Sequence, residues 1–217
     1  MGKEKKPFSI NLEKWLEENG GWGLDPPQEF IDNWTRIFEN RIDDALKPVW
    51  RDLWFLHNWV KTRKPQTILE FGSGCSTAIM AHALWHNRKG WIDSVEDGLG
   101  WVKENEKIIQ PYLSSIVNFY YCPILIEKYN GEVVFRYHGS FPAGPDFIYL
   151  DGPILYKECG ITINPLELEF SFPKGFTMII DGRGPTVEFY LRNFRRRYRW
   201  VRIKDTDIRF TIFELLE

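Results

Sequence analysis

Acidic residues and glycines lie close together in the middle of the chain, and their types suit binding of a small polar ligand. Glu70 stands two positions before Gly72, and Gly74 follows, so a carboxylate precedes a Gly-x-Gly turn. Glycine lets the backbone turn sharply and approach a ligand without an intervening Cβ. Further acidic residues follow later apolar runs, at Glu96, Asp97, Asp151 and Asp181. Because like charges repel, this repetition predicts a ligand site rather than a stabilising cluster.

A scaffold must bring these residues together, and from residue 65 onward short apolar runs alternate with amphipathic stretches. Strands are predicted over residues 67–71, 91–96, 117–121, 146–151 and 176–181, and helices over 77–86, 101–110 and after 184. Asn130-Gly131 predicts a hairpin, and two further strands over 198–204 and 208–215 close the chain. This alternation predicts an α/β fold with a mostly parallel sheet and an antiparallel C-terminal hairpin strand.

In such a sheet, ligands bind beyond the carboxyl ends of the strands, where these acids are placed. The helix predicted after Ser76 would add free N–H groups and positive potential at its start. Glu96 lies 22 residues after Gly74, at the end of the next strand, where a carboxylate can bind both ribose hydroxyls. Thr77 stands where a dinucleotide fingerprint would have its third glycine. The combination indicates an adenosine-type ligand and leaves nicotinamide cofactors and S-adenosylmethionine (SAM) open.

Glu70 favours SAM, because a carboxylate there would repel a pyrophosphate and attract the ammonium and sulfonium groups of SAM. The chain here resembles the class I SAM-dependent methyltransferases, which are Rossmann-like doubly wound proteins. The resemblance covers about residues 65–215 and is carried by ordered segments at 70–76, 94–96, 146–153 and 172–175.

The resemblance implies a set of cofactor-binding residues along these segments. They are Glu70, Gly72, Ser73, Gly74, Ser76, Thr77, Glu96, Asp97, Cys122 and Asp151. Glu96 would bind the ribose, Asp97 and Cys122 would lie near the adenine, and Asp151 would face the reactive methyl group. Asp151 and His138 are the catalytic candidates, since a base assists methyl transfer to a hydroxyl. His57 is predicted to be a core or interface histidine.

Some O-methyltransferases of this class hold a divalent metal with acids at the ends of the fourth and fifth strands. Asp151 and Asp181 match two such positions, but Gly182 stands where an Asn or Asp ligand is expected. Two carboxylates with water could still hold Mg²⁺. Asp181 is equally explained as a turn residue before Gly182-Arg183-Gly184, so a metal is left open and none is predicted.

Residues 1–64 form a Trp-rich extension ahead of the domain predicted at 65–217. Six of the ten tryptophans lie in this extension, at positions 15, 22, 34, 50, 54 and 59. Helices are predicted at about 11–18, with Ser9 as its cap, at 26–42 and at 49–60. Such an aromatic stripe must be buried, either against the following domain as an acceptor wall or in a homo-oligomer interface.

Charge and cysteine content exclude several classes of protein. The formal net charge is −2, and the arginines at 192–202 are interpreted as a solvated helix end, which disfavours a nucleic-acid substrate. Three cysteines without a CxxC pair argue against disulfides or structural zinc. No apolar run is long enough for a membrane span and no signal peptide is apparent, so we expect a cytoplasmic protein.

These observations predict SAM-dependent O- or N-methylation of a small-molecule or glycan-type acceptor. Two alternatives are kept: an NAD(P)-dependent oxidoreductase, which Glu70 disfavours, and a non-catalytic module that retains the fold for binding or assembly. The sequence does not identify the acceptor or the methylated atom.

Overall fold

A central sheet carries the acidic segments, as the apolar runs of the sequence predict. The computed structural model describes residues 8–39, 47–142, 144–154, 160–203 and 208–217. The sheet strands are β1 (Phe8–Ser9), β2 (Thr67–Phe71), β3 (Trp91–Glu96), β4 (Val117–Tyr121), β7 (Phe147–Leu150), β8 (Thr177–Asp181), β9 (Tyr198–Arg202) and β10 (Phe210–Leu215). Their spatial order is β1-β9-β10-β8-β7-β2-β3-β4. Neighbours among β4, β3, β2, β7 and β8 pair in parallel, whereas β10 is antiparallel to β8 and β9.

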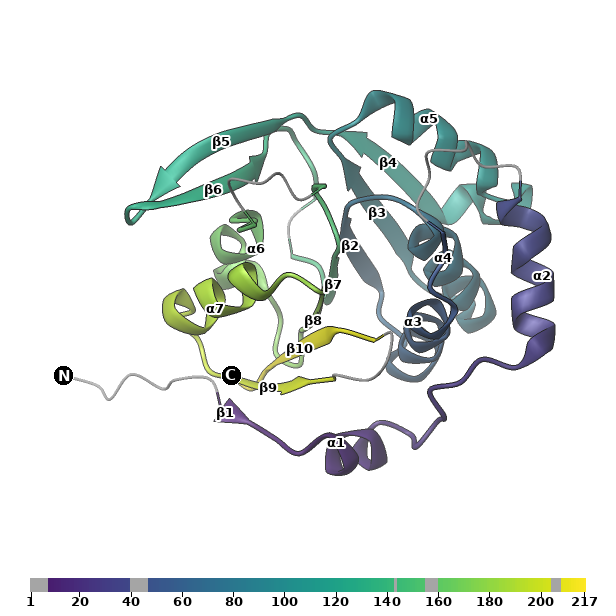
Figure 1. Cartoon of the computed structure of the whole chain (residues 1–217), viewed down its shortest axis with the longest axis horizontal. Coiled ribbons are helices and arrows are strands. Elements are labelled where there is room, and N and C mark those ends of the chain that lie inside the picture. Colours follow the sequence, from purple (N-terminus) through teal and green to yellow (C-terminus); the bar gives the residue numbers. More distant parts are fainter. Residues whose placement is uncertain (1–7, 40–46, 143, 155–159, 204–207) are drawn as a thin grey trace.

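Helices cover both faces of this sheet (Figure 1). They are α1 (Leu12–Glu18), α2 (Gln28–Phe38), α3 (Trp50–Arg63), α4 (Cys75–Asn87), α5 (Leu99–Ile108), α6 (Asn164–Glu167) and α7 (Gly184–Asn193), with 3₁₀ turns η1 (Pro111–Ile116) and η2 (Glu169–Ser171). In Figure 1, α3, α4 and α5 lie on one side of the strands and α6 and α7 on the other. Among the described helices, none combines the length and the apolar character that a membrane crossing requires.

The predicted hairpin is present but stands apart from the main sheet. Strands β5 (Ile124–Tyr129) and β6 (Glu132–Tyr137) pair with each other as a separate two-stranded sheet. Figure 1 shows the hairpin extending beyond α6 and α7. Asn130 and Gly131 both have positive φ at its tip, which explains why this dipeptide marks the turn. The doubly wound α/β fold and the antiparallel C-terminal strand are confirmed.

One detail of the N-terminal prediction is wrong, and another concerns a residue outside the described part of the chain. Ser9 is not the cap of the first helix, because it belongs to β1 and pairs with Trp200 of β9. Asn11 is the cap instead: its side-chain oxygen accepts a hydrogen bond from the Lys14 backbone N–H at 3.2 Å. The second helix ends at Phe38. Residue Ile42, which the pattern includes in that helix, lies outside the described residues.

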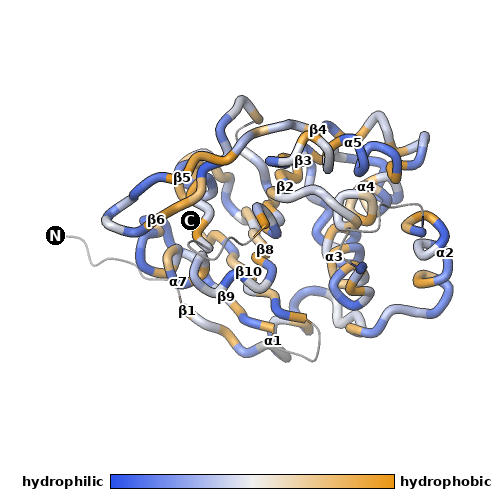
Figure 2. The backbone as a smooth tube through the Cα atoms, turned by 45° about the horizontal axis from the view of Figure 1, so that its top comes forward, coloured by the Kyte–Doolittle hydropathy of each residue, from blue (hydrophilic) through white to orange (hydrophobic). Residues whose placement is uncertain are grey.

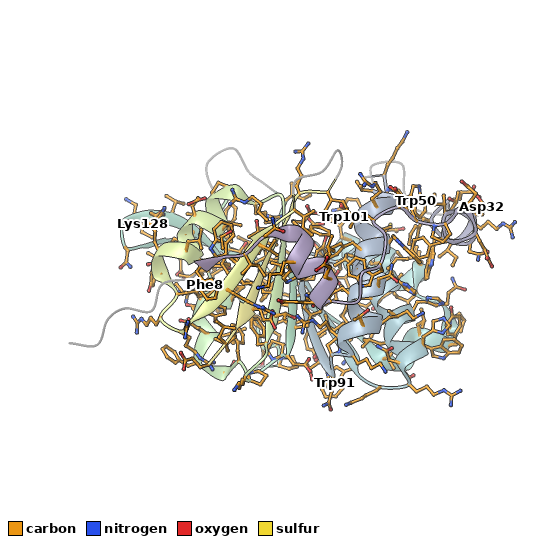
Figure 3. The ribbon with its side chains drawn as sticks, turned by 90° about the horizontal axis from the view of Figure 1, so that it is seen from below. Phe8, Asp32, Trp50, Trp91, Trp101 and Lys128 are labelled. Atoms are coloured by element: carbon orange, nitrogen blue, oxygen red, sulfur yellow. The ribbon has the colours of Figure 1, made fainter. Side chains whose placement is uncertain are left out.

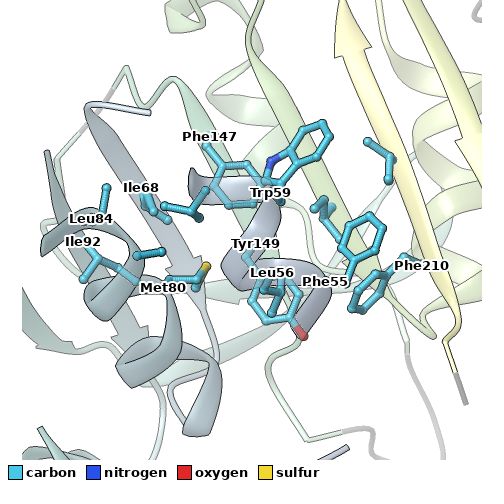
Figure 4. Close-up of a cluster of buried hydrophobic side chains, with 14 of the residues drawn as sticks. Phe55, Leu56, Trp59, Ile68, Met80, Leu84, Ile92, Phe147, Tyr149 and Phe210 are labelled. Atoms are coloured by element: carbon cyan, nitrogen blue, oxygen red, sulfur yellow. The ribbon is translucent and has the colours of Figure 1, made fainter. Parts of the chain in front are cut away.

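Tryptophans of the N-terminal helices pack into the same core as the sheet. Trp15 and Trp59 are each 1% exposed, and their rings stack with centroids 5.1 Å apart. Figure 4 shows Phe55 and Trp59 of α3 next to Phe147 of β7 and Phe210 of β10. These five side chains and Leu56 belong to a single buried hydrophobic cluster. Figure 2 shows α2 beside α3 and α4, where Trp34 and Phe38 contribute to another cluster. The division near residue 64 stays a prediction, and so does an oligomer interface.

Candidate functional site

The turn between β2 and α4 is built around the buried carboxylate of Glu70. Its Oε1 accepts a hydrogen bond from the Ser76 hydroxyl at 2.5 Å. Its Oε2 accepts from the Thr77 hydroxyl at 2.5 Å and the Ser94 hydroxyl at 2.6 Å. Glu70 is fully buried, and this burial raises its pKa to about 7, although the three hydroxyl groups favour the charged form. Glu70 therefore fixes the start of α4 against both β2 and β3.

Gly72 brings the β2 turn into backbone contact with the end of β7. Its φ is +93°, and a Cβ at this position would lie 2.5 Å from the Gly152 backbone nitrogen. Gly152 belongs to a turn with a cis Gly152-Pro153 peptide bond. A Cβ on Gly74, by contrast, would meet only the Ser76 hydroxyl oxygen, at 4.0 Å. The first glycine therefore permits close packing, and the second leaves space at the start of α4.

Glu96 at the end of β3 closes the other side of this turn. Its Oε2 accepts hydrogen bonds from the backbone N–H and the hydroxyl of Ser73, at 3.0 and 3.2 Å. Its Oε1 accepts from the Gly98 backbone N–H at 2.9 Å. Burial raises the pKa of Glu96, against these backbone hydrogen bonds. A carboxylate offers about four acceptor positions, so Glu96 retains capacity for a ligand hydroxyl.

Two of the remaining predicted site residues lie beside Glu96, and the third directly follows β6. Cys122 is 2% exposed, and its backbone N–H donates to the Glu96 carbonyl at 2.8 Å. Asp97 follows Glu96 directly and is half-buried. His138 is exposed, and its backbone N–H donates to the Pro123 carbonyl at 2.8 Å. The roles of all three stay predictions.

Asp151 lies in a cavity of about 930 Å³ at the carboxyl edge of the sheet. The cavity is lined by Asp25, Pro26, Ile31, Pro48, Val49, Trp50, Arg51, Asp52, Asp151, Asp181, Gly182, Arg183 and Arg209. Asp151 is 51% exposed there, and its Oδ1 lies 4.0 Å from Nη2 of Arg183. The same Nη2 donates to the Asp151 backbone carbonyl.

Asp151 and Asp181 form an acidic pair with an arginine beside it. Partial burial and the negative charge of Asp181 together raise the pKa of Asp151 to about 7, against the effect of Arg183. Burial likewise raises the pKa of Asp181, whose Oδ2 accepts a hydrogen bond from the Tyr149 hydroxyl at 3.3 Å. A carboxyl group with a pKa near 7 suits proton transfer at neutral pH.

Comparisons with known proteins place this geometry in a known architecture. No family model matches the chain, and no curated protein matches it. An O-methyltransferase from Bacillus cereus, solved in complex with SAH, is 14% identical; the match covers 95% of this chain and 97% of that one, with a TM-score of 0.56. TomG from Streptomyces achromogenes, an O-methyltransferase involved in tomaymycin synthesis and solved with SAM, is 12% identical over 96% and 100% of the two chains, with a TM-score of 0.55. A methyltransferase from Geobacter sulfurreducens is 12% identical over 95% and 99%, with a TM-score of 0.58. The chain has the SAM-dependent methyltransferase fold.

Within this methyltransferase fold, the sequence patterns did not predict one wall of the cavity. Figure 3 shows Trp50 and Trp101 at one side of the molecule and Trp91, which begins β3, at the opposite side. The start of α3 therefore lies at the carboxyl edge, and residues 48–52 line the cavity together with Asp151. Only chain folding brings these segments together. Arg183 could have been noticed from its place after Asp181-Gly182, whereas nothing local marks Arg209.

Further polar residues that sequence patterns miss hold the turn and the start of β2 in place. Asn105 of α5 is 1% exposed, and its Nδ2 donates to the Ser73 hydroxyl at 2.8 Å. Asp146 accepts hydrogen bonds from the backbone N–H groups of Gln66 and Thr67, both at 2.8 Å, and fixes the start of β2. Such partners become visible only when the tertiary structure is known.

A metal at Asp151 and Asp181 stays an open question. In the part of the chain that the structure describes, no group of three or more His, Cys, Asp or Glu residues is arranged to hold a metal ion. Arg183, whose Nη2 lies 4.0 Å from Oδ1 of Asp151, supplies a permanent positive charge beside this carboxylate.

Proposed function

We propose that this chain is a methyltransferase that binds SAM at the Glu70–Thr77 turn and methylates an acceptor held in the 930 Å³ cavity. The observation that carries the proposal is the convergence of three strand ends. Glu70 on β2, Glu96 on β3 and Asp151 after β7 meet at one edge of a methyltransferase-like sheet, next to that cavity.

The residues at this edge fit SAM. Gly74 has no close neighbour on the side where a Cβ would lie, and the N-terminus of α4, which is the positive end of the helix dipole, follows directly after it. Glu96 retains an acceptor position for a ribose hydroxyl, and Glu70, Glu96 and Asp151 provide negative charge for a cationic ligand. The same negative charge would repel the pyrophosphate of NAD.

When bound, SAM supplies an electrophilic methyl group on a sulfonium, and the chain's own residues would orient and deprotonate the acceptor. Asp151 is placed to take the proton of an acceptor hydroxyl because its pKa lies near neutrality and its side chain is half exposed in the cavity. Arg183, 4.0 Å away, would stabilise the negative charge that develops on the acceptor oxygen. Most of the remaining rate enhancement would come from positioning.

The acceptor belongs in the cavity because of its size and its mixed wall. A volume of about 930 Å³ accommodates a small molecule or a sugar-sized group. The N-terminal segment contributes Pro26, Ile31 and Trp50, which suit an apolar or ring-shaped part of the acceptor. The acceptor-wall hypothesis for the extension follows from this lining. Both a small molecule and a glycan are acceptors that fit this proposal.

Calorimetry with SAM, S-adenosylhomocysteine and NAD tests the proposal directly. We expect saturable binding of the first two and no binding of NAD. Binding of NAD alone would overturn the assignment in favour of an oxidoreductase. Binding of none of the three would favour a non-catalytic module that retains the fold.

Replacing Glu96 by Gln is expected to weaken SAM binding about tenfold, because a neutral amide loses a charge-assisted hydrogen bond to the ribose. Calorimetric titration of the purified variant measures the change. Glu106→Gln is the matched control: it makes the same replacement at an exposed position on the neighbouring helix α5. Equal SAM affinities of the two variants would contradict the ribose role of Glu96.

SAM affinity is expected to rise with pH between about 6 and 8. The raised pKa of Glu70 leaves this carboxyl partly protonated near pH 7, and a cationic ligand favours the ionised form. SAM binding should therefore release protons near neutral pH. Calorimetry in buffers of different ionisation enthalpy measures that release, and Glu70→Gln should reduce it. An affinity independent of pH over this range would argue against a negatively charged Glu70 as part of the SAM site.

A further inference from the structure

A second, smaller groove adjoins the acceptor cavity and differs from it in charge. Its volume is about 410 Å³, and it is lined by Gly182, Arg183, Gly184, Val187, Arg202, Arg209 and Thr211. Three of these residues are arginines, and none of the described lining residues is acidic. Gly182, Arg183 and Arg209 also line the larger cavity, so the two spaces share a wall.

Arg183 in this shared wall is buried without enough hydrogen-bond acceptors. It is 4% exposed, and its Nη2 donates to the carbonyl oxygen of Asp151. Nε and Nη1 have no partner among the residues that the structure describes. Buried N–H groups of a charged guanidinium are costly when they lack acceptors. An oxyanion in the groove would supply acceptors that the described chain does not.

The other two arginines place further positive charge around the same groove. Nε of Arg202 donates to the Thr211 hydroxyl at 3.4 Å, and its Nη2 lies 3.5 Å from the exposed carboxylate of Glu188. Arg209 is exposed, and its carbonyl accepts from the Gly182 N–H at 3.1 Å, which holds the two turns together. Helix α7 begins at the groove and adds the positive potential of its N-terminus.

We propose that this groove binds a phosphate or carboxylate group of the acceptor, so that the substrate is a small anionic molecule whose methylated atom lies at Asp151. This inference rests on the proposed methyltransferase function. Guanidinium groups bind both kinds of oxyanion through paired N–H donors. Because Arg183 contacts Asp151 and also lines the groove, the two parts of such an acceptor would lie on either side of this arginine.

The surrounding charges favour a small anion over a nucleic acid. Neighbouring arginines outside the groove are engaged in ion pairs with acidic residues of the chain: Arg192 with Glu132, Arg197 with Glu217, and Arg199 with Glu18 and Glu214. A nucleic acid requires a row of available cations along successive phosphates. The net charge of the chain is −2.

Ligand-observed NMR tests the proposal. It measures the binding of phenyl phosphate, benzoate and neutral benzyl alcohol to the full chain. We expect one or both anions to bind saturably and at least tenfold more tightly than the alcohol. Arg209→Ala should weaken the binding of these anions about tenfold or more. Arg192→Ala is the matched control, because Arg192 is an exposed arginine of helix α7 that pairs with Glu132 outside the groove. It should leave anion affinity unchanged.

Equal affinity for the anions and the alcohol would overturn the proposal, and so would equal losses in the two variants. Tighter binding of a short single-stranded oligonucleotide that depends on Arg209 would also overturn it, in favour of a nucleic-acid substrate. SAM titrations of the same three proteins separate this inference from the proposed function. Normal SAM affinity without anion binding overturns only the groove assignment, whereas anion binding without SAM binding overturns the methyltransferase proposal.

Discussion

Replacing Gly72 by Ala is expected to lower the free energy of unfolding by about 3 kcal/mol and to abolish SAM binding. A φ of +93° disfavours any residue with a Cβ, and the added methyl group would lie 2.5 Å from the Gly152 nitrogen. Backbone atoms on both sides cannot yield as a flexible side chain would, so the β2 and β7 turns must separate. Denaturant unfolding measures the loss, and calorimetry measures SAM binding.

Gly175→Ala isolates the cause of that loss. Gly175 also has a positive φ, +79°, but no atom lies within 4 Å of the position that its Cβ would take. This control variant carries the conformational strain alone, about 1 kcal/mol. If both variants lose the same stability, the close approach of the Gly72 and Gly152 turns is not what glycine serves at position 72.

The pattern of strands and the glycine turn could be predicted because both are encoded locally. Apolar runs of the right length predict β2, β3, β7 and β8 correctly, and Asn130-Gly131 predicts the β5–β6 hairpin. A Gly-x-Gly turn that follows an apolar run marks a place where the chain turns sharply, because glycine adopts backbone conformations that other residues avoid. The convergence of Glu70 and Glu96 then follows from parallel pairing of neighbouring strands, which places their carboxyl ends together.

The cavity at Asp151 could not be predicted in the same way, because its lining residues come from distant segments. The tryptophan stripe predicts that a helix face is buried, but the spacing of the tryptophans does not identify the surface that this face packs against. The structure places Trp15 and Trp59 in the core and Trp50 at the cavity. Arg183 and Arg209 lie on different elements, and the antiparallel pairing of β8 with β10 brings them to one wall. The Ser9 prediction failed because a neighbouring strand competes for that residue.

A chain of three histidines between α3 and α4 is expected to make the fold sensitive to acid. His57 is 6% exposed, and its Nε2 lies 3.4 Å from Nδ1 of His82, whose Nε2 lies 3.2 Å from Nε2 of His86. Burial lowers the pKa of His57 to about 3 and that of His82 to about 4, and the nearby positive charge of Lys61 acts in the same direction. Trp54 stacks on the His57 ring with centroids 5.7 Å apart.

The sign of the effect follows from these lowered values. Above the ordinary histidine pKa, His57 is neutral in both the folded and the unfolded chain and contributes nothing to the pH dependence of stability. As the pH falls below about 6.5, the unfolded chain binds a proton that the folded chain does not, so the folded state loses stability until the pH approaches 3. Glu70 and Asp151 act oppositely, because their raised pKa values let the folded chain take up protons first.

The contribution of His57 to the pH dependence of stability can therefore be separated from that of these carboxyls only by comparing wild type with a His57 variant. We expect wild-type protein to lose about 2–3 kcal/mol more than His57→Gln between pH 7.5 and 4.5, since each pH unit contributes about 1.4 kcal/mol for one histidine. Any pH-independent cost of the substitution cancels, as do the contributions of Glu70 and Asp151. His138→Gln is the matched control, because His138 is exposed and its variant should follow wild type at both pH values. Parallel stability curves for wild type and His57→Gln would show that His57 is protonated as readily in the folded chain as in the unfolded one, and the burial of this ring would then not be what makes the fold sensitive to acid.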